Sequence, residues 1–192
     1  MAVSHGGFGH GDMTTGAHRC FAVDGWRMEI EWTPAIVAAL WAIILGGAGG
    51  LLTEIGDWYR NLNKPSWQPP DWLFGPAWTI ILGLSGWSLY LAWTSAQTLT
   101  DGVVIGALFA INFVLHLAWS PLFFKVKRPD FALVENAFLW LSVLSLCLVL
   151  PRYSELAGWL NVPYIAWVSF AMLLNWKIVQ LNRPFGNKAA EA

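Results

Sequence analysis

Five stretches of the chain are long, apolar and almost free of charged residues. A helix needs roughly 20 apolar residues to cross a hydrocarbon core of about 30 Å, and each stretch meets that length. The helices of a soluble bundle keep a polar face for water, and these stretches show none. The pattern therefore predicts an all-α membrane protein with a five-transmembrane-helix bundle, formed by residues 34–53, 72–100, 102–124, 131–150 and 156–176.

Composition agrees with a membrane protein of one domain. Of the 192 residues, 56% are hydrophobic and only 12% are charged, whereas ordinary soluble domains carry about 25% charged residues. The net charge of −1 offers no basic face for phosphate, so nucleic acid is excluded as a partner. Membrane lipid is the expected surrounding. The 14 tryptophans are a large excess for a chain of this length, which indicates a specific role for some of them.

The two ends of the chain differ from the apolar middle. Residues 1–33 are rich in glycine and polar side chains, which predicts a disordered N-terminal extension, and residues 184–192 form a polar C-terminal tail. The extension lacks an apolar core segment, so it is not expected to be a cleaved signal peptide. Its histidines and Cys20 could be interpreted as a metal site, but their spacing matches no common ligand pattern. Translation that starts at Met28, which would remove these residues, is at least as good an interpretation of the extension as a metal site.

Basic residues near the ends of the spans predict the orientation in the membrane. Cytoplasmic loops carry an excess of Lys and Arg. One side has Arg19, Arg27 and Arg152; the other has Arg60, Lys64, Lys125, Lys127, Arg128, Lys177, Arg183 and Lys188. This bias predicts an integral multi-pass protein of the cytoplasmic membrane with its N-terminus outside and its C-terminus in the cytoplasm. An outer-membrane location is the alternative.

The segment between the first two spans is stiff and aromatic. Residues 58–78 read WYRNLNKPSWQPPDWLFGPAW. Four prolines fix the backbone, and the tryptophans present large rings that lose little entropy when a ligand binds. An aromatic belt at the membrane interface also gathers tryptophan, but a belt does not require the prolines. We therefore expect this segment to be a lid.

Three motifs of the chain resemble those of a known family. The first is the segment just quoted, the second is AWSPLFF at residues 118–124, and the third is PYIAWVSFAMLLN at residues 163–175. Together they resemble the TspO/MBR family of tryptophan-rich sensory and translocator proteins, over roughly residues 34–183. The resemblance implies a dimeric five-helix membrane protein that binds porphyrins such as protoporphyrin IX or haem, and in many members sterols or drug-like apolar ligands. It implies no required cofactor.

The resemblance also implies where a ligand binds. A flat macrocycle favours flat aromatic walls, and the family's pocket tryptophans fall on Trp78 and Trp167. For every aromatic residue, packing in the core is the alternative role. The full set of expected ligand-binding residues is Ala48, Trp67, Phe74, Trp78, His116, Trp119, Phe131, Glu135, Phe138, Trp167, Phe170, Ala171 and Asn175.

Several positions depart from the family pattern. His116 stands where the family usually has Asn, and a ring nitrogen can bond a ligand, ligate iron or simply bond within the bundle. Glu135, by contrast, matches a family position that is often acidic, and as a carboxylate inside a span it is expected to face the bundle or a cavity. Trp176 replaces the tyrosine of a sterol-recognition pattern, so porphyrin is a better candidate ligand than sterol.

Small residues on the third span predict a contact between helices. Gly102, Gly106 and Ala110 recur every four residues, which lets two backbones approach closely in a bilayer. The resembling family dimerises through this helix, so these residues are the expected dimer interface. Packing within the chain is the alternative.

Two functions from different classes follow. The first is an integral membrane tetrapyrrole-binding protein that acts in sensing, regulation or transport. The second is a membrane enzyme that degrades porphyrin with light and oxygen, for which Trp78 and Trp167 are the catalytic candidates because tryptophan can pass an electron to a photoexcited porphyrin. No metal site is expected.

Overall fold

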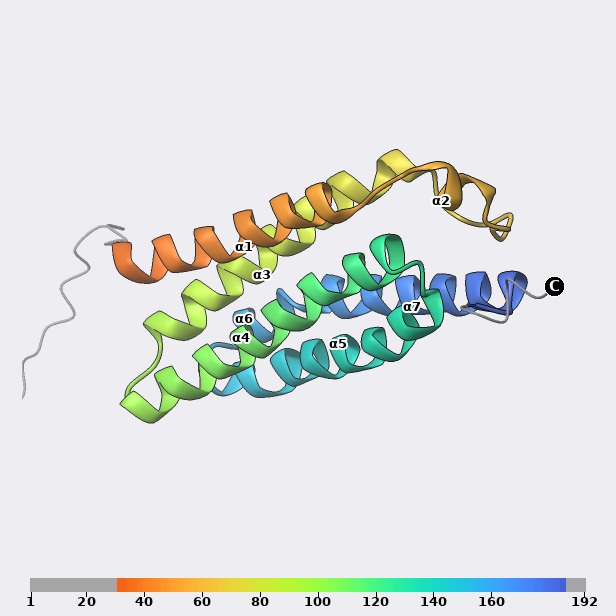
Figure 1. The fold of residues 1–192 in the computed structure, drawn as a ribbon. Helices are drawn as coiled ribbons and strands as arrows, with labels where there is room; N and C mark the ends of the chain where they lie inside the picture. The colour runs from red at the N-terminus through yellow and green to blue at the C-terminus, as the bar shows by residue number, and fades with distance from the viewer. Residues whose placement is uncertain (1–30, 186–192) are drawn as a thin grey trace, which may run out of the picture. The chain divides into compact units, whose positions relative to one another are not determined.

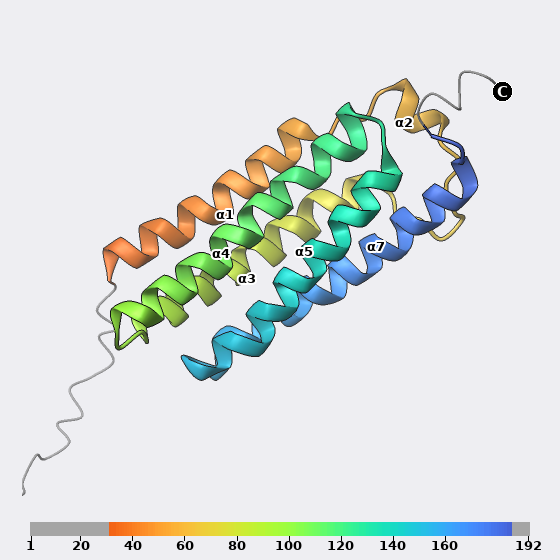
Figure 2. The same ribbon diagram turned by 60° about the horizontal axis from the view of Figure 1, so that its bottom comes forward.

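The computed structural model describes residues 31–185, which contain helices and no strands. The predicted disordered extension and the polar tail lie almost wholly outside these residues. Five helices are long, and in Figures 1 and 2 they run side by side in one bundle. They are α1 (Trp32–Leu52), α3 (Phe74–Thr94), α4 (Leu99–Ser120), α5 (Pro129–Val149) and α7 (Val162–Asn182).

Shorter elements join the long helices. A single α-helical turn lies in each of two connections, as α2 (Asp57–Asn61) and α6 (Glu155–Trp159). One-turn 3₁₀ segments are η1 (Asp71–Leu73) and η3 (Leu150–Arg152), and η2 (Pro121–Lys125) is a π-turn that follows α4. Proline begins α5, where its missing N–H needs no partner.

The second predicted span is shorter than expected. Helix α3 ends at Thr94, and Thr98 begins the next helix. The hydroxyl of Thr98 accepts a hydrogen bond from the backbone N–H of Asp101, whose carboxylate accepts one from the N–H of Thr98. This capping box satisfies two N–H groups that a helix start leaves free, so the chain turns at residues 95–98 instead of continuing as helix.

Four segments of the described chain are long and apolar enough to cross a membrane: Trp32–Leu52, Leu99–Lys125, Pro129–Arg152 and Glu155–Asn182. Helix α3 has 21 residues but is not among them. Its composition explains why, because Ser85, Gly86 and Ser88 lower its hydropathy on a face that is buried in the bundle. Ser85 and Ser88 are fully buried there.

The buried serines of α3 bind the connection between α5 and α7. Ser85 donates to Oδ1 of Asn161 at 2.7 Å, and Nδ2 of Asn161 donates to Oγ of Ser88 at 2.7 Å. Ser88 in turn donates to the carbonyl of Ala157 at 2.6 Å. These bonds satisfy every polar side chain in the cluster and so remove most of the penalty for burying it.

Glycine permits the close packing of α1 on α3. A Cβ atom at Gly86 would lie 3.1 Å from the carbonyl oxygen of Ala38 and 3.2 Å from Cβ of Ala42. Large apolar side chains of α1 such as Ile43 and Leu40 point outward and are exposed. The bundle therefore presents apolar side chains both inside and outside, as a bilayer requires.

The three residues predicted for a dimer interface have different surroundings. A Cβ atom at Gly106 would meet the ring of Trp93 on α3 at 3.8 Å, so Gly106 packs within the chain. Gly102 has open space around the same position, and Ala110 is exposed. Dimerisation through these residues stays a prediction.

Candidate functional site

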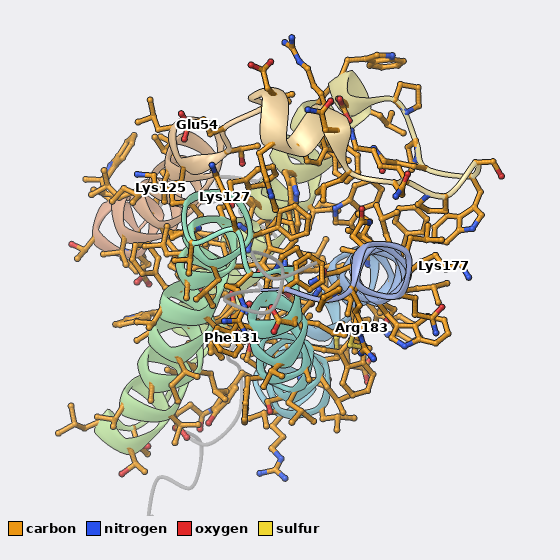
Figure 3. The ribbon with its side chains drawn as sticks, turned by 45° about the vertical axis from the view of Figure 1, so that its right-hand side comes forward. Glu54, Lys125, Lys127, Phe131, Lys177 and Arg183 are labelled. Carbon is orange, nitrogen blue, oxygen red and sulfur yellow. The ribbon has the colours of Figure 1, made fainter. Side chains whose placement is uncertain are left out.

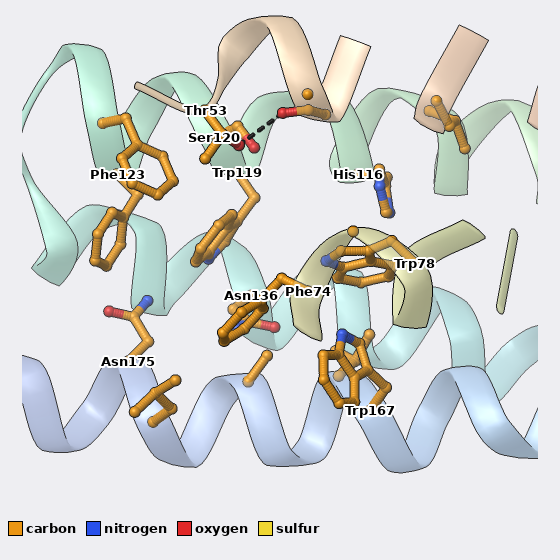
Figure 4. A pocket seen from close by; sticks show the side chains of 18 of the residues that line it. Thr53, Phe74, Trp78, His116, Trp119, Ser120, Phe123, Asn136, Trp167 and Asn175 are labelled. Atoms are coloured by element: carbon orange, nitrogen blue, oxygen red, sulfur yellow. Dashed lines mark hydrogen bonds between the residues drawn. The ribbon is translucent and has the colours of Figure 1, made fainter. Parts of the chain in front are cut away.

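A cavity of about 400 Å³ lies among the long helices, near the end of the bundle that carries α2. This volume falls within the roughly 300–1,000 Å³ range of small-molecule sites. Every long helix contributes to its wall (Figure 4), and so does the segment between α1 and α3. Its lining includes Gly46, Gly49, Gly50, Thr53, Ile55, Tyr59, Asp71, Phe74, Gly75, Trp78, Thr79, His116, Trp119, Ser120, Phe123, Asn136, Trp167, Ala171, Leu174 and Asn175.

Aromatic rings form much of the cavity wall. The rings of Trp78 and Trp167 are perpendicular, with centroids 6.2 Å apart, and Phe74 lies 5.6 Å from Trp167. On α4 and η2, Trp119 and Phe123 stack with centroids 5.1 Å apart. Figure 4 shows these side chains converging from α3, α4 and α7. Such a wall favours a flat, apolar ligand.

Glycines of α1 complete the opposite wall. Gly49 and Gly50 have no atom of another residue within 4 Å of the position a Cβ would take. Gly46 has only the side chain of Leu82 at 3.9 Å. The missing side chains leave space beside the aromatic wall, so the sequence's glycine cluster in the first span contributes directly to the cavity volume.

A buried chain of hydrogen bonds starts at His116. Its Nδ1 lies 2.8 Å from the hydroxyl of Tyr164, which donates to Oδ1 of Asn112 at 3.3 Å. Nδ2 of Asn112 donates to Ser142, which donates to the carbonyl of Leu139. The chain links α4, α7 and α5 and fixes the imidazole at the cavity wall.

Three polar atoms of cavity-lining residues have no partner within the described part of the protein. They are Oδ1 of Asn136 and the indole Nε1 atoms of Trp119 and Trp167. An unpaired buried polar atom is costly, and in native proteins it often marks a place where a ligand or water binds. The wall therefore offers a ligand two donors and one acceptor that no described residue uses.

The segment from residue 53 to residue 73 contributes Thr53, Ile55, Tyr59 and Asp71 to the cavity lining and is held at several points. The Tyr59 hydroxyl donates to Asp71 at 3.0 Å and accepts from Gln68 at 3.1 Å, while the ammonium of Lys64 lies 3.7 Å from the Tyr59 ring. Burial, with help from the Asp71 carboxylate, raises the pKa of Tyr59 to about 12. Hydrogen bonds and a cation–π contact therefore hold the segment together, in addition to the prolines that restrict its backbone.

The same segment is bound to the end of α7. The backbone N–H of Asn63 donates to Oδ1 of Asn182, and Nδ2 of Asn182 donates to the carbonyl of Asn63, both at 2.8 Å. Trp67 packs against Phe170 with ring centroids 5.9 Å apart. Two separate contacts therefore fasten the segment over α7.

The structure brings about half of the predicted ligand-binding residues together. Those that line the cavity are Phe74, Trp78, His116, Trp119, Trp167, Ala171 and Asn175. Asn175 also ties α7 to α5, since its amide can donate to the carbonyl of Pro129 and accept from the N–H of Leu133, each at 3.1 Å.

The other predicted residues lie outside the cavity lining. Phe131 and Phe138 on α5 point outward and are 50% and 57% exposed, and the Arg128 guanidinium covers the Phe131 ring. Trp67 and Phe170 form the contact just described, one layer behind the wall. Ala48 does not line the cavity, and Glu135 is buried with neither carboxylate oxygen bonded to a described residue.

Some lining residues were not predicted. Asn136, Thr53 and Ser120 are polar, and Tyr59 and Asp71 come from the segment between α1 and α3. Asn136 could have been found as a polar residue within an apolar span. The two residues of the segment carried no such signal, because their place depends on how the segment folds back.

Long apolar helices and outward-facing apolar side chains define the class: this is an integral membrane protein of the all-helical type. Comparison with known proteins gives the family. The family model described as TspO/MBR matches residues 35–181. The chain therefore belongs to the TspO/MBR family, and the resemblance inferred from the motifs is confirmed.

Individual relatives come from bacteria and animals. The chain is 41% identical over 142 residues to the tryptophan-rich protein TspO of Chlorobaculum tepidum, a match that covers 73% of this chain and 90% of that protein. It is 32% identical over 169 residues to the translocator protein of Bos taurus, covering 85% and 100%. It is 33% identical over 160 residues to the tryptophan-rich sensory protein of Cereibacter sphaeroides, covering 81% and 95%.

Proposed function

We propose that this protein binds a tetrapyrrole, namely a porphyrin or another haem-pathway intermediate, in the cavity among its helices. The observation that carries the proposal is the aromatic wall formed by Trp78, Trp167, Phe74 and Trp119. Indole faces offer a macrocycle both stacking and apolar burial, and the volume suits a small molecule. Sterols and drug-like apolar ligands are secondary candidates for the same space.

The biological role that we assign is sensing, regulation or transport of that ligand. The relatives' names, translocator protein and tryptophan-rich sensory protein, support these two readings of one binding event. In either role the protein must bind and release its ligand without consuming it. A cavity at one end of the bundle, lined in part by the segment of residues 53–73, suits reversible binding.

The fold that we propose in the membrane is a five-helix bundle with a lid. Helix α3 would be the fifth span, since it is as long as α1 and lies between membrane-length neighbours. Its buried serines lower its apolar content without exposing polar groups to lipid. The segment of residues 53–73 is the lid, because it lines the cavity and is fastened to α7 by side-chain contacts.

The basic residues support one orientation. Lys125, Lys127, Lys177 and Arg183 gather at the end of the bundle that carries α2, as Figure 3 shows. By the positive-inside rule this end faces the cytoplasm, which places the N-terminus outside in a cytoplasmic membrane. A homodimer through the exposed face of α4 that carries Ala110 completes the proposed assembly.

The test is a titration of the full-length protein in detergent with protoporphyrin IX, read by tryptophan fluorescence. The test variant is Trp78→Phe/Trp167→Phe. The matched control is Trp87→Phe/Trp176→Phe, which changes an exposed tryptophan on each of the same two helices. We expect saturable binding that weakens about tenfold in the test variant, given about 0.5–1.5 kcal/mol for each aromatic contact. Equal, non-saturating quenching in all three proteins would contradict the proposal.

A second candidate function is light- and oxygen-dependent degradation of the bound porphyrin. The contact between Trp78 and Trp167 favours it. An indole that gives an electron to an excited porphyrin can be reduced again by electron transfer from its neighbour, whose ring centroid is 6.2 Å away. Under this hypothesis both residues are catalytic. Binding without any light-dependent product would remove this candidate and leave the first intact.

A further inference from the structure

The imidazole of His116 uses only one of its two nitrogens within the protein. Nδ1 is bonded to Tyr164, and the side chain lines the cavity. Within residues 31–185 no hydrogen bond engages the other nitrogen, Nε2. Whether Nε2 carries a proton or a free electron pair decides what it can bind, and the bonded neighbours fix the answer.

The direction of the hydrogen-bond chain sets the tautomer. A hydroxyl has a single proton to donate. Ser142 gives its proton to the carbonyl of Leu139, so it accepts from Nδ2 of Asn112. Oδ1 of Asn112 then accepts the proton of Tyr164.

The hydroxyl oxygen of Tyr164 is therefore left as the acceptor for His116. Nδ1 of His116 carries the proton and donates it to Tyr164, and Nε2 of the neutral ring keeps an electron pair. Tyr164 and Asn112 are completely buried, so water does not compete for these bonds.

Packing fixes the orientation of the ring as well. The Trp78 ring stands perpendicular to the imidazole, with centroids 4.7 Å apart. Figure 4 shows the two side chains next to each other. A histidine that ligates a metal through one nitrogen almost always donates its other N–H to a fixed acceptor, which orients the ring and increases its basicity. His116 and Tyr164 have this arrangement.

A free metal ion does not suit this position. In the described part of the chain there is no group of three His, Cys, Asp or Glu side chains that could hold one. One imidazole on an apolar wall binds a metal that arrives with most of its ligands already in place. An iron porphyrin is such a species, because the macrocycle supplies four nitrogens and leaves an axial position open.

We propose that Nε2 of His116 is the axial ligand of an iron porphyrin bound in the cavity, and that Tyr164 is the residue that positions it. The inference rests on the proposed tetrapyrrole function and narrows it to iron-containing ligands. It also gives a role to the departure from the family's usual Asn, because an amide does not form a comparable bond to haem iron.

The test compares ferric and ferrous haem with metal-free protoporphyrin IX, using the full-length protein in detergent. We expect the wild type to show histidine-ligated haem spectra in the Soret region and in electron paramagnetic resonance. His116→Ala should lose these spectra and weaken haem binding by about tenfold or more, a larger loss than for metal-free protoporphyrin IX, which has no iron to ligate. Saturable binding of the metal-free ligand also shows that the variant is folded.

Three further variants make the assignment specific. In Tyr164→Phe the axial ligand remains but loses its hydrogen-bond partner, so the spectra should persist with affinity for haem about tenfold lower. Replacement of His5, His10 and His18, the other histidines of the chain, should leave the spectra unchanged. Addition of free imidazole to His116→Gly should restore them.

The outcomes separate the two proposals. If haem spectra are the same in the wild type and in His116→Ala while protoporphyrin IX still binds saturably, axial ligation by His116 is wrong and the tetrapyrrole function stands. If the spectra are lost when His5, His10 and His18 are replaced, the assignment to His116 is also wrong. If neither porphyrin binds the wild type saturably, both proposals fall.

Discussion

Asn182 near the end of α7 holds both backbone groups of Asn63, its Oδ1 accepting from the N–H and its Nδ2 donating to the carbonyl, each at 2.8 Å. The two residues are 119 positions apart in sequence. Their contact joins the segment of residues 53–73, part of which lines the cavity, to the helix that carries Trp167 and Ala171. If the segment is a lid, this pair sets how readily it opens.

Removing the Asn182 amide should speed the release of ligand. Each intramolecular hydrogen bond contributes about 1 kcal/mol net, so losing the two that join Asn182 to Asn63 should raise the dissociation rate of protoporphyrin IX by up to about thirtyfold in Asn182→Ala. Stopped-flow fluorescence measures this rate. The control is Gln180→Ala, because Gln180 is exposed and lies two positions before Asn182 on the same helix. This variant should release ligand at the wild-type rate. Equal rates in all three proteins would show that the lid does not limit release.

Tyr59 should make the lid sensitive to alkaline pH. Its pKa is about 12 in the folded protein against an ordinary 10.0, chiefly because the phenol is buried. A group whose pKa is raised on folding stabilises the fold fully below its ordinary pKa and loses that contribution as pH passes its folded value. The lid contact is therefore intact below pH 10 and is lost as pH rises toward about 12.

The measurement for Tyr59 is the ligand dissociation rate as a function of pH, together with tyrosinate absorbance. The wild-type dissociation rate should rise across the same alkaline pH range in which Tyr59 ionises and its tyrosinate absorbance appears. Tyr59→Phe should lack both this titration step and the rise, and it should release ligand faster than the wild type at neutral pH. A pH-dependent rise that survives in Tyr59→Phe would assign the effect to another group.

Packing of α1 against α3 should depend on the absence of a side chain at Gly86. Its Cβ position lies 3.1 Å from a backbone oxygen of α1, so Gly86→Val should force the helices apart and destabilise the protein by about 1–3 kcal/mol. Gly83 lies on the same helix with open space around it, and Gly83→Val is the matched control. Thermal unfolding in detergent should show a clear loss only for Gly86→Val. Equal behaviour of the two variants would mean that α1 shifts freely.

Hydropathy alone placed most of the long helices, but it misjudged where α3 ends and which faces point inward. It also placed the last span at residues 156–176, whereas a short helix precedes α7, which runs from Val162 to Asn182. The end of α3 depends on the Thr98–Asp101 capping box, a local polar signal inside a long apolar stretch. The faces are harder, because lipid and core both favour apolar side chains. For this reason Phe131 and Phe138 looked like Phe74 in sequence, yet only Phe74 lines the cavity.

The polar part of the site was only partly visible in the sequence. His116 stood out as a titratable residue in a span, and Asn112 lay one turn before it. Their partner Tyr164 comes 48 residues after His116, and Ser142 comes from a third helix, so only the folded bundle joins them. The tautomer of His116 follows from these hydrogen bonds between helices, and no neighbouring residue in the sequence indicates it.

The second candidate function makes a separate prediction about light. Under illumination with oxygen, loss of bound porphyrin should be slow or absent in Trp78→Phe/Trp167→Phe, because phenylalanine is much harder to oxidise than tryptophan. Trp87→Phe/Trp176→Phe should behave like the wild type. Absorbance spectra taken at saturating ligand make the comparison independent of affinity. Equal photochemical loss in both variants would show that these tryptophans are not catalytic.

The central claim, that the cavity is where tetrapyrrole binds, is tested most directly by filling it. Ala171 on α7 lines the cavity, whereas Ala166 on the same helix is exposed on its outer side. The measurement is the equilibrium affinity for protoporphyrin IX of the wild type, Ala171→Phe and Ala166→Phe. Overfilling a packed site costs about 1–3 kcal/mol, so Ala171→Phe should weaken binding about tenfold or more while Ala166→Phe leaves it unchanged. Equal affinities in all three proteins would place the porphyrin elsewhere and contradict the account.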